Sequence, residues 1–326
     1  MSEITLAEAV NQALAYEMAA DKNVVTFGED IAVNGGVFRV TVGLLDKFGP
    51  ERVFDTPIGE SLIAGLAIGM ATQGLRPVAE FQFLGFIYPA VDQIISHASR
   101  MRNRTRGRLS CPLVFRVPFG GFIRAIEHHS ESTEAMFAHM PGLRIVIPSS
   151  PARAYGLLLA AIRDPDPVMF LEPKRLYRLV KQNVPDDGQA LPLDKCFVLR
   201  EGSDVTLVSW GPAVHETLQA ADALAKEGIS AEVIDVATIK PLDIDTILHS
   251  VEKTGRCVII HEAARTCGVG AEIAAQIAEH GLMSLLAPVQ RVTGYDTVMP
   301  YLKMERLYQT TVPKILNAVQ NILEYA

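Results

Sequence analysis

The chain has 326 residues, 49% of them hydrophobic and 21% charged, a balance typical of globular proteins and a length that allows two full cores. The formal net charge of −7 gives no electrostatic support for nucleic-acid binding, and none of the four cysteines forms a C-x-x-C pair that would suggest a zinc site. No apolar run is long enough to span a bilayer, and the first residues do not resemble a signal or transit peptide. We therefore expect no membrane association and a cytoplasmic protein with reduced thiols, or an organellar protein that has already been cleaved.

Strands and helices are predicted to alternate along the whole chain. In the first half the predicted elements are helix 6–20, strand 24–28, a strand ending at 54, a helix starting at 60, strand 77–83, helix 88–101, strand 112–118, strand 144–148, helix 152–163 and strand 167–172. In the second half they are strand 204–210, helix 213–227, strand 230–235, helix 243–253, strand 257–262, helix 270–280, strand 289–293 and helix 312–323. This order predicts an α/β protein with mostly parallel sheets, in two domains at 1–179 and 201–326, joined by a linker at 180–200.

The stretch Asp55-Thr-Pro-Ile-Gly-Glu60 introduces a helix that is apolar on nearly every side and is therefore predicted to be buried. Pro57 and Gly59 predict a loop before this helix, and Gly74 predicts its end. Glu60 then lies in the first helical turn. The simpler explanation of this residue is that an acidic side chain suits the positive end of the helix dipole. The alternative is a catalytic carboxylate whose proton affinity is set by burial.

A series of motifs resembles one protein family over essentially the whole chain. After the Glu60 motif, the matching segments are Gly74-Leu-Arg-Pro-Val-Ala-Glu80-Phe81, Ala90-Val-Asp92-Gln93-Ile94, His128-His129-Ser130, Pro141-Gly-Leu-Arg-Ile-Val-Ile-Pro148-Ser, Leu171-Glu-Pro-Lys-Arg-Leu-Tyr177 and Glu201-Gly-Ser-Asp-Val-Thr-Leu-Val208. They are similar to the beta subunits of thiamine-diphosphate-dependent 2-oxo acid dehydrogenases, the decarboxylating first components of the pyruvate and branched-chain complexes. Many matches in the right order are more specific than any single motif.

The resemblance implies a fold and an assembly. The first domain is expected to have the thiamine-pyrimidine-binding fold and the second a transketolase C-terminal-like fold, within an alpha-two beta-two heterotetramer. In this family the alpha subunit carries a Gly-Asp-Gly motif that holds the diphosphate through Mg²⁺, and that motif is absent from this sequence. The chain is therefore expected to supply the aminopyrimidine half of a shared thiamine diphosphate site, with Mg²⁺ held by the alpha subunit, and to be inactive alone.

The resemblance also assigns roles to individual residues around the cofactor. Glu60 matches the carboxylate that hydrogen-bonds the aminopyrimidine ring nitrogen. Gln82 and Phe86 match positions that line the pyrimidine pocket, although some relatives have methionine in place of Gln82. Ile58, inside the Glu60 motif, is expected to contact the cofactor as well.

The histidine pair at 128–129 is the second candidate for catalysis. A histidine that packs in a core or caps a helix is the simpler explanation from the residues alone. In the family pattern the histidine directly before serine is functional, so the resemblance implies an acid–base role near the cofactor for His129. Relatives usually have a third glycine in the preceding loop where Phe122 stands. Ser130 is predicted to cap the helix that includes Glu134.

Five further residues match a monovalent-cation site of relatives that is built mostly from backbone carbonyls. They are Leu113, Ala161, Ile162, Asp164 and Asp166. The resemblance therefore implies a K⁺ site. The simpler explanation of Asp164-Pro-Asp166-Pro is a plain turn before a strand.

The implied activity is oxidative decarboxylation of a 2-oxo acid and reductive acylation of a lipoyl group, with His129 delivering a proton. The implied partners are the alpha subunit and the subunit-binding and lipoyl domains of a dihydrolipoyl acyltransferase. Phe81-Gln-Phe-Leu-Gly-Phe86 resembles bacterial pyruvate forms, whereas Leu171–Tyr177 and Lys253-Thr-Gly-Arg-Cys257 resemble branched-chain forms. We favour pyruvate because the first segment is nearer the chemistry, with the branched-chain 2-oxo acids as the alternative.

Two other interpretations compete with this one. Transketolases and deoxyxylulose-phosphate synthases share the architecture, but they are much longer and contain the diphosphate half of the site. A non-catalytic scaffold subunit would need neither Glu60 nor His129. Gly268-Val-Gly270 hints at a dinucleotide loop but lacks the third glycine of that fingerprint, so we interpret it as packing at the entry of a helix.

Overall fold

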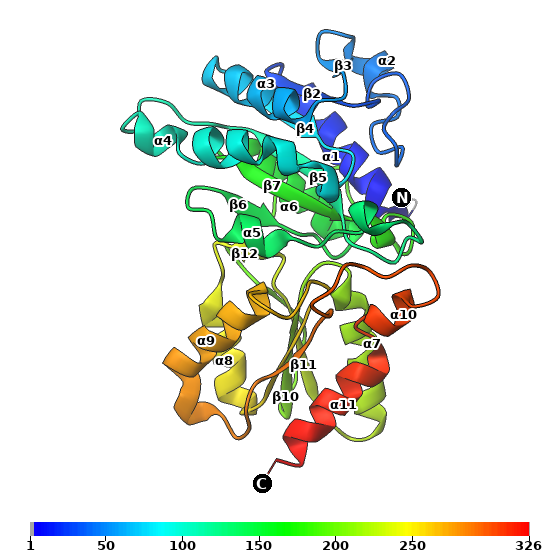
Figure 1. Ribbon diagram of the computed structural model, residues 1–326, viewed down its shortest axis with the longest axis vertical. Helices are drawn as coiled ribbons and strands as arrows, with labels where there is room; N and C mark the ends of the chain where they lie inside the picture. Colours follow the sequence, from blue (N-terminus) through cyan, green and yellow to red (C-terminus); the bar gives the residue numbers. More distant parts are fainter. Residues whose placement is uncertain (1–2, 326) are drawn as a thin grey trace. The chain divides into compact units, whose positions relative to one another are not determined.

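Figure 1 shows the computed structural model, which describes residues 3–325 and divides into two compact units. The first unit comprises the chain up to Phe119 together with Met136–Leu193. The second unit comprises Gly120–Ala135 and the chain from Asp194 onward. The stretch Gly120–Ala135 contains both candidate histidines and is called the histidine segment below. It comes from the first half of the sequence but folds as part of the second unit.

The first unit is built on a parallel sheet. Its strands, in spatial order, are β6 (Arg144–Val146), β7 (Val168–Pro173), β5 (Val114–Phe119), β4 (Arg76–Glu80), β2 (Val24–Gly28) and β3 (Val53–Asp55). All five pairings between these neighbours are parallel. The strands β2, β5 and β7 are buried along their whole length, as expected for parallel strands with both faces covered. Two short strands, β1 (Ile4–Thr5) and β8 (Lys181–Gln182), pair antiparallel beside it.

Helices connect and cover these strands. They are α1 (Leu6–Ala20), α2 (Leu44–Phe48), α3 (Glu60–Thr72), α4 (Met101–Arg104) and α6 (Pro151–Arg163), with shorter turns η1 (Leu84–Phe86), η2 (Tyr88–Ala90), η3 (Gln93–Ala98) and η5 (Lys174–Leu176). Thr5 and Glu8 form a reciprocal capping box that starts α1. Helix α1 packs on α6, while α3 packs on β4 and on the η2–η3 segment.

The predicted regular helix at 88–101 is wrong in detail. The structure has a 3-10 turn at η2, a π-turn at η3 and the short α4 in its place. Pro89 lies in the first turn, where it has no N–H to donate. The amide of Ser99 donates to the carbonyl of Ile94 at 3.0 Å, five residues back, which is the wider spacing of a π-helix.

A buried arginine joins three neighbouring strands of the first sheet. Arg116 in β5 donates to both carboxylate oxygens of Glu172 in β7, at 2.6 and 2.8 Å, and to Glu80 at the end of β4, at 2.7 Å. The Tyr177 hydroxyl donates to Glu172 at 2.6 Å. Burial alone would lower the pKa of Arg116, but Glu172 and Glu80 raise it above its usual value. Burial raises the pKa of Glu80, and Arg116 opposes that shift.

The second unit is an open sheet between two layers of helices (Figure 1). Its strands, in spatial order, are β14 (Gln290–Val292), β13 (Cys257–Ile260), β10 (Val205–Ser209), β11 (Ala231–Asp235) and β9 (Phe197–Arg200). Only β9, at the edge, runs antiparallel to its neighbour. Helices α8 (Ile244–Thr254) and α9 (Val269–Gly281) cover one face, and α7 (Ala213–Lys226) and α11 (Val312–Leu323) cover the other. The remaining elements are β12 (Thr238–Lys240), η6 (Leu282–Ser284) and α10 (Glu305–Tyr308).

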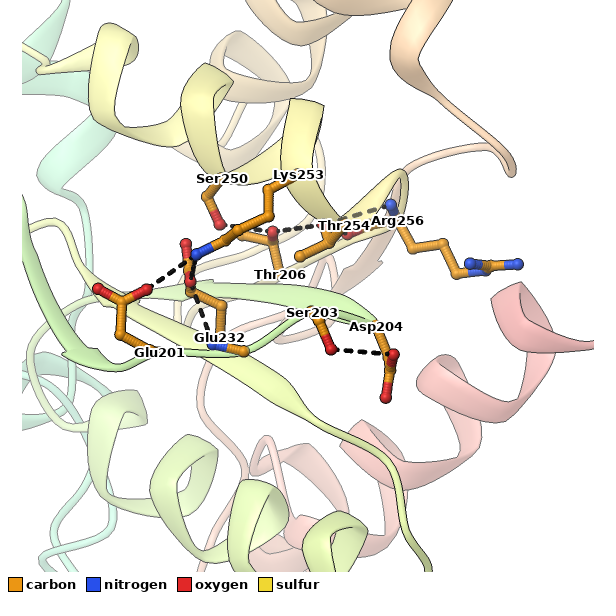
Figure 2. Close-up of polar contacts among 10 residues, drawn as sticks. Glu201, Ser203, Asp204, Thr206, Glu232, Ser250, Lys253, Thr254 and Arg256 are labelled. Atoms are coloured by element: carbon orange, nitrogen blue, oxygen red, sulfur yellow. Dashed lines mark hydrogen bonds and ion pairs between the residues drawn. The ribbon is translucent and has the colours of Figure 1, made fainter.

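Polar side chains fix the end of α8 to the amino-terminal edge of this second sheet (Figure 2). Lys253 donates to Glu201 at 2.8 Å and also pairs with Glu232 in β11. Burial opposes ionisation of Glu232, but the hydrogen bond from Lys253 prevails and its pKa is lowered. Three hydroxyls beside this pair share hydrogen bonds of 2.6 and 2.8 Å, those of Thr206, Ser250 and Thr254. Lys253, which belongs to the segment resembling branched-chain forms, therefore has a structural role.

The cysteine side chains and the lengths of the helices bear on the predictions of reduced thiols and of no membrane association. All four cysteines are free, three of them buried and Cys267 exposed. Burial raises the pKa of the Cys257 thiol to about 12, so this side chain behaves as a small apolar residue. Within residues 3–325 no helix has the length and apolar character that crossing a membrane requires.

We predict that Arg116→Met lowers the free energy of unfolding by about 3–5 kcal/mol, because it leaves Glu80 and Glu172 buried without a counter-charge. The matched control is Arg102→Met, which removes an exposed ion pair to Asp166 with an N–O distance of 2.7 Å. That loss should stay below about 1 kcal/mol. Urea unfolding of the purified variants measures both, and equal stability of the two variants would contradict the prediction.

Candidate active site

Glu60 begins α3 behind a loop, as the sequence predicted. The helix starts at Glu60, with Gly59 before it, and the Glu60 side chain is half-buried. The prediction that this helix is buried on all sides is wrong. Leu62 is 51% exposed and Ile58, just before the helix, is 87% exposed. Apolar composition alone does not say which neighbour covers a helix, and in the single chain one side of this first turn is uncovered.

A second carboxylate, Glu29, lies beside Glu60 and was missed by the sequence reasoning. Glu29 follows the carboxyl end of β2, is buried, and accepts a hydrogen bond from the Gly59 N–H at 3.3 Å. Burial raises the pKa of Glu29, and the nearby charge of Glu60 raises it further. A Cβ atom at Gly28 would lie 2.4 Å from the carbonyl oxygen of Glu80, so only glycine lets β2 run this close to β4. The signal in the sequence was the acidic pair Glu29-Asp30 directly after the predicted strand 24–28.

The residues before Glu60 organise the loop around it. Asp55 accepts hydrogen bonds from the N–H groups of Ala32, at 2.7 Å, and Val33, at 3.4 Å. The Thr56 hydroxyl oxygen is buried and has no hydrogen-bond partner among residues 3–325. A buried polar atom without a partner is costly, which makes this a position where a polar ligand atom fits. This observation supports an aminopyrimidine group beside Glu60.

Gln82 and Phe86 lie on the segment that leaves β4. Gln82 is half-buried, and Phe86 ends the turn η1. Phe86 packs edge-on against Phe83, with ring centroids 5.4 Å apart, and the Lys174 amino group lies 5.1 Å from the centre of the Phe83 ring. The Ser61 hydroxyl in α3 donates to the Pro89 carbonyl at 2.6 Å. This bond fixes the first turn of α3 to the turn that directly follows Phe86.

The histidine segment presents its two histidines in different environments. They end the 3-10 turn η4 (Glu127–His129), in which the His129 N–H donates to the Ile126 carbonyl at 3.0 Å. His128 is exposed and His129 is half-buried. The two predicted catalytic residues therefore belong to different units, Glu60 to the first and His129 to the second.

The structure bears on the sequence observations made for Phe122 and Ser130 in this segment. Phe122 and Arg124 have φ angles of 61° and 60°, in the left-handed region that favours glycine. The glycine that the family resemblance implies at position 122 would adopt this region freely, whereas a residue with a side chain costs roughly 1–2 kcal/mol there. The prediction that Ser130 caps a helix is wrong. Helix α5 (Glu134–Ala138) starts four residues later, and the Ser130 hydroxyl is buried without a partner among residues 3–325.

Several oxygen atoms of the five residues matched to a cation site already accept hydrogen bonds or form ion pairs within the chain. Arg76 donates to the carbonyls of Ile162, at 2.8 Å, and Asp164, at 3.3 Å. The carbonyl of Leu113 accepts from the Val168 N–H at 3.0 Å. The carboxylates of the two aspartates pair with arginines, Asp164 with Arg144 and Asp166 with Arg102. A cation would have to share these oxygens, and the K⁺ site stays a prediction.

Known proteins match the chain along its full length. Residues 2–180 match the family described as "Transketolase, pyrimidine binding domain" and residues 194–315 match "Transketolase, C-terminal domain". The pyruvate dehydrogenase E1 component subunit beta of Bacillus subtilis is 47% identical over 325 residues, covering 100% of both chains. That of Acholeplasma laidlawii is 49% identical over 322 residues, covering 99% of this chain and 98% of the relative. The chain belongs to the family of pyruvate dehydrogenase E1 component beta subunits.

The fold of this E1 beta chain agrees with a solved structure named "Split gene transketolase, inactive beta4 tetramer". The two share 25% sequence identity with a TM-score of 0.81, over 99% of each chain. The predicted family and the predicted fold class, a pyrimidine-type unit followed by a transketolase C-terminal-like unit, are thus confirmed. In the part of the E1 beta chain from residue 3 to 325, no group of three or more His, Cys, Asp or Glu side chains could hold a metal ion.

The histidine segment of the E1 beta chain ends at a carboxylic acid with an unusual environment. Glu134 is buried and accepts a hydrogen bond from the Trp210 indole N–H at 3.3 Å. Burial raises the pKa of Glu134 to about 7, and the charge of Glu262 adds to the shift. Sequence reasoning noted Glu134 only as a helix residue, because nothing in its local pattern reveals a tryptophan 76 positions away.

We predict that the stability of the E1 beta chain falls as pH rises through about 7. The Glu134 proton is bound more tightly when folded (pKa about 7) than when unfolded, so its contribution is present below about pH 4.5 and is lost above pH 7. Glu134→Gln is neutral at every pH, so its advantage over wild type should grow by about 1–3 kcal/mol between pH 5 and 8. Urea unfolding across that range measures this, with the exposed Glu272→Gln as control; parallel curves for wild type and Glu134→Gln would refute it.

Proposed function

We propose that this chain is the beta subunit of an E1 component that decarboxylates pyruvate and transfers the acyl group to a lipoyl group. The observation that carries the proposal is the Glu60 carboxylate at the start of α3, behind a loop that carries the unpartnered Thr56 hydroxyl and the exposed Ile58. A polar donor–acceptor edge with an apolar neighbour suits an aminopyrimidine ring. The relatives named above are pyruvate dehydrogenase subunits, which favours pyruvate over branched-chain 2-oxo acids.

In this proposal Glu60 hydrogen-bonds the aminopyrimidine ring nitrogen. Glu29 fixes the Gly59 amide and, with its raised pKa, keeps its proton more readily than an ordinary glutamate. A carboxyl group with a raised pKa, Glu29, then lies beside the carboxylate that faces the ring, an arrangement that suits proton movement. Ile58, Gln82 and Phe86 surround and orient the ring. Bound thiamine diphosphate supplies the electron sink that decarboxylation requires.

We propose that His129 serves the second half of the reaction. In the overall change, the bond between C1 and C2 of the 2-oxo acid breaks and carbon dioxide leaves. The lipoyl disulfide accepts two electrons, one sulfur forms the thioester, and the other sulfur takes a proton. The half-buried His129 delivers that proton, a role to which an imidazole side chain is suited. The lipoyl domain and the subunit-binding domain of an acyltransferase are the proposed partners.

Several observations support the need for an alpha subunit. The sequence has no Gly-Asp-Gly motif, which the family resemblance assigns to the alpha subunit. The exposed Ile58 and Leu62 beside Glu60 suit a covering partner. The structural neighbour with the same two domains is named an inactive beta4 tetramer. We propose an alpha-two beta-two assembly in which the alpha subunit holds the diphosphate through Mg²⁺, and this chain alone has no activity.

Co-expression with the alpha subunit encoded beside it tests the proposed function. We expect thiamine-diphosphate-dependent decarboxylation only in the pair, with pyruvate preferred to 3-methyl-2-oxobutanoate. The beta chain alone is the control. Activity in the lone chain would overturn the shared site, and preference for the branched acid would overturn the assignment of pyruvate.

Within the active pair, Glu60→Ala should lower the decarboxylation rate by about 10²–10⁴-fold, the usual contribution of a positioned acid–base group. The free energy of unfolding should change little, because Glu60 is half-buried and serves the cofactor instead of the core. Glu51→Ala, on an exposed turn before β3, is the matched control. An active Glu60→Ala heterotetramer would disprove the role of Glu60.

A further inference from the structure

The carboxyl ends of β10 and β13 mark the point at which a ligand crevice is expected in the second sheet. After β10 the chain forms β11 on one side of that strand, and it later forms β13 on the other side. The direction in which strands are added to the sheet therefore reverses between β10 and β13. In open parallel sheets the crevice at such a point is the usual place for a ligand. Ser209 pairs with Ile260 in register, and Trp210 and His261 follow. Their rings stack with centroids 5.0 Å apart, and Glu262 comes next.

In this chain the histidine segment lies at that crevice. One carboxylate oxygen of Glu262 accepts from the Gly121 N–H, at 2.6 Å, and from the Ser132 hydroxyl, at 2.8 Å. The Gly120 N–H donates to the Glu131 carbonyl at 2.8 Å, so the two limbs of the segment are also bonded to each other. Glu262 is only 5% exposed. A single buried carboxylate thus binds both limbs of the loop, one on each side of the histidines.

Close packing and two further bonds complete the attachment. A Cβ atom at Gly120 would lie 3.0 Å from Glu262, and one at Gly121 would lie 2.3 Å from the Met299 methyl group. Side chains at these positions would therefore meet the tips of Glu262 and Met299, which would have to shift. Trp210 bonds Glu134 at one end of the segment, and Glu305 accepts from the Arg124 N–H at 3.4 Å in the middle.

The attachment works against the local preference of the backbone. The left-handed conformations of Phe122 and Arg124 are unfavourable for residues with side chains, so the segment does not hold this shape by itself. Glu262 accepts hydrogen bonds from both limbs at a buried position, where hydrogen bonds are stronger because water is excluded. Glu262 is placed where it can impose this shape.

We infer that Glu262 is a positioning residue for His129, which it holds through both limbs of the histidine segment. The inference rests on the role proposed above for His129 in acyl transfer. The second unit therefore contributes to the reaction by using its ligand crevice to fix a catalytic loop of its own chain. Nothing in this role requires Glu262 to touch substrate or cofactor.

The test uses the assembled alpha–beta enzyme with thiamine diphosphate and two assays. One follows decarboxylation with an artificial electron acceptor, and the other follows acylation of an isolated lipoyl domain. Glu262→Ala should lower lipoyl acylation by about tenfold to a hundredfold, the cost of misplacing a group by about 1 Å, and leave the artificial-acceptor rate within about threefold. Ser132→Ala should show a smaller loss of the same kind. Glu262→Gln, which keeps the oxygen acceptor, should recover most of the acylation rate, and the exposed Glu272→Ala should match wild type.

Two comparisons separate this inference from the proposed function. His129→Ala is assayed in parallel, and hydrogen exchange of amides 120–135 is measured in each variant. Faster exchange in Glu262→Ala but not in Glu272→Ala, with the selective loss of acylation, supports the inference. If His129→Ala loses lipoyl acylation and Glu262→Ala does not, the inference is overturned. It is also overturned if Glu262→Ala lowers the rates of both assays equally. Wild-type acylation by His129→Ala overturns the proposed role of His129 itself, and with it the catalytic purpose of the attachment.

Discussion

The buried pairing of Arg116 with Glu80 and Glu172 is the constraint on which the first unit depends. Three parallel strands meet at one guanidinium that water cannot reach, so any slip in register would leave a charge unpaired in the interior. The constraint reaches the site through aromatic contacts. Tyr177 bonds Glu172 and packs on Phe38, and Phe38 packs on Phe83, which supports Phe86. The charge network and the candidate pyrimidine pocket are thus one continuous structure.

The carboxyl ends of the strands have different surroundings in the two units. In the first unit, the residues after β2 and β3 include a buried carboxylate and a buried, unpartnered hydroxyl near an exposed apolar turn, where we propose that the cofactor binds. In the second unit, the corresponding edge is filled by the histidine segment. The proposed chemistry divides along the same line, with Glu60 serving the cofactor in one unit and His129 serving acyl transfer in the other.

Much of the fold was predictable because it follows local rules. Short windows of sequence already show the helical spacing of apolar residues in α11, the capping residues of α1 and α8, and the strands made almost wholly of apolar residues. The glycines at 268 and 270 were correctly interpreted as helix-entry packing, since a Cβ atom at either would lie within 2.9 Å of the His261 ring. Glu29, Thr56 and Glu262 were not predicted to be functional. The importance of Glu29 and Glu262 depends on partners 30 to 141 positions away, and that of Thr56 on a hydroxyl that folding leaves buried and unpaired; a single sequence reveals neither.

The second unit is built from two separate stretches of the sequence, which limits how relatives of this chain can be recombined. A chimera that takes residues 1–179 from one relative and the rest from another would place a foreign histidine segment on the host's Glu262 and Trp210. The segment and its crevice are then drawn from different lineages, although the exchange respects the order of the sequence. Residues 120–135 should instead be exchanged with the second unit, so that inheritance follows the folded units and not the linear chain.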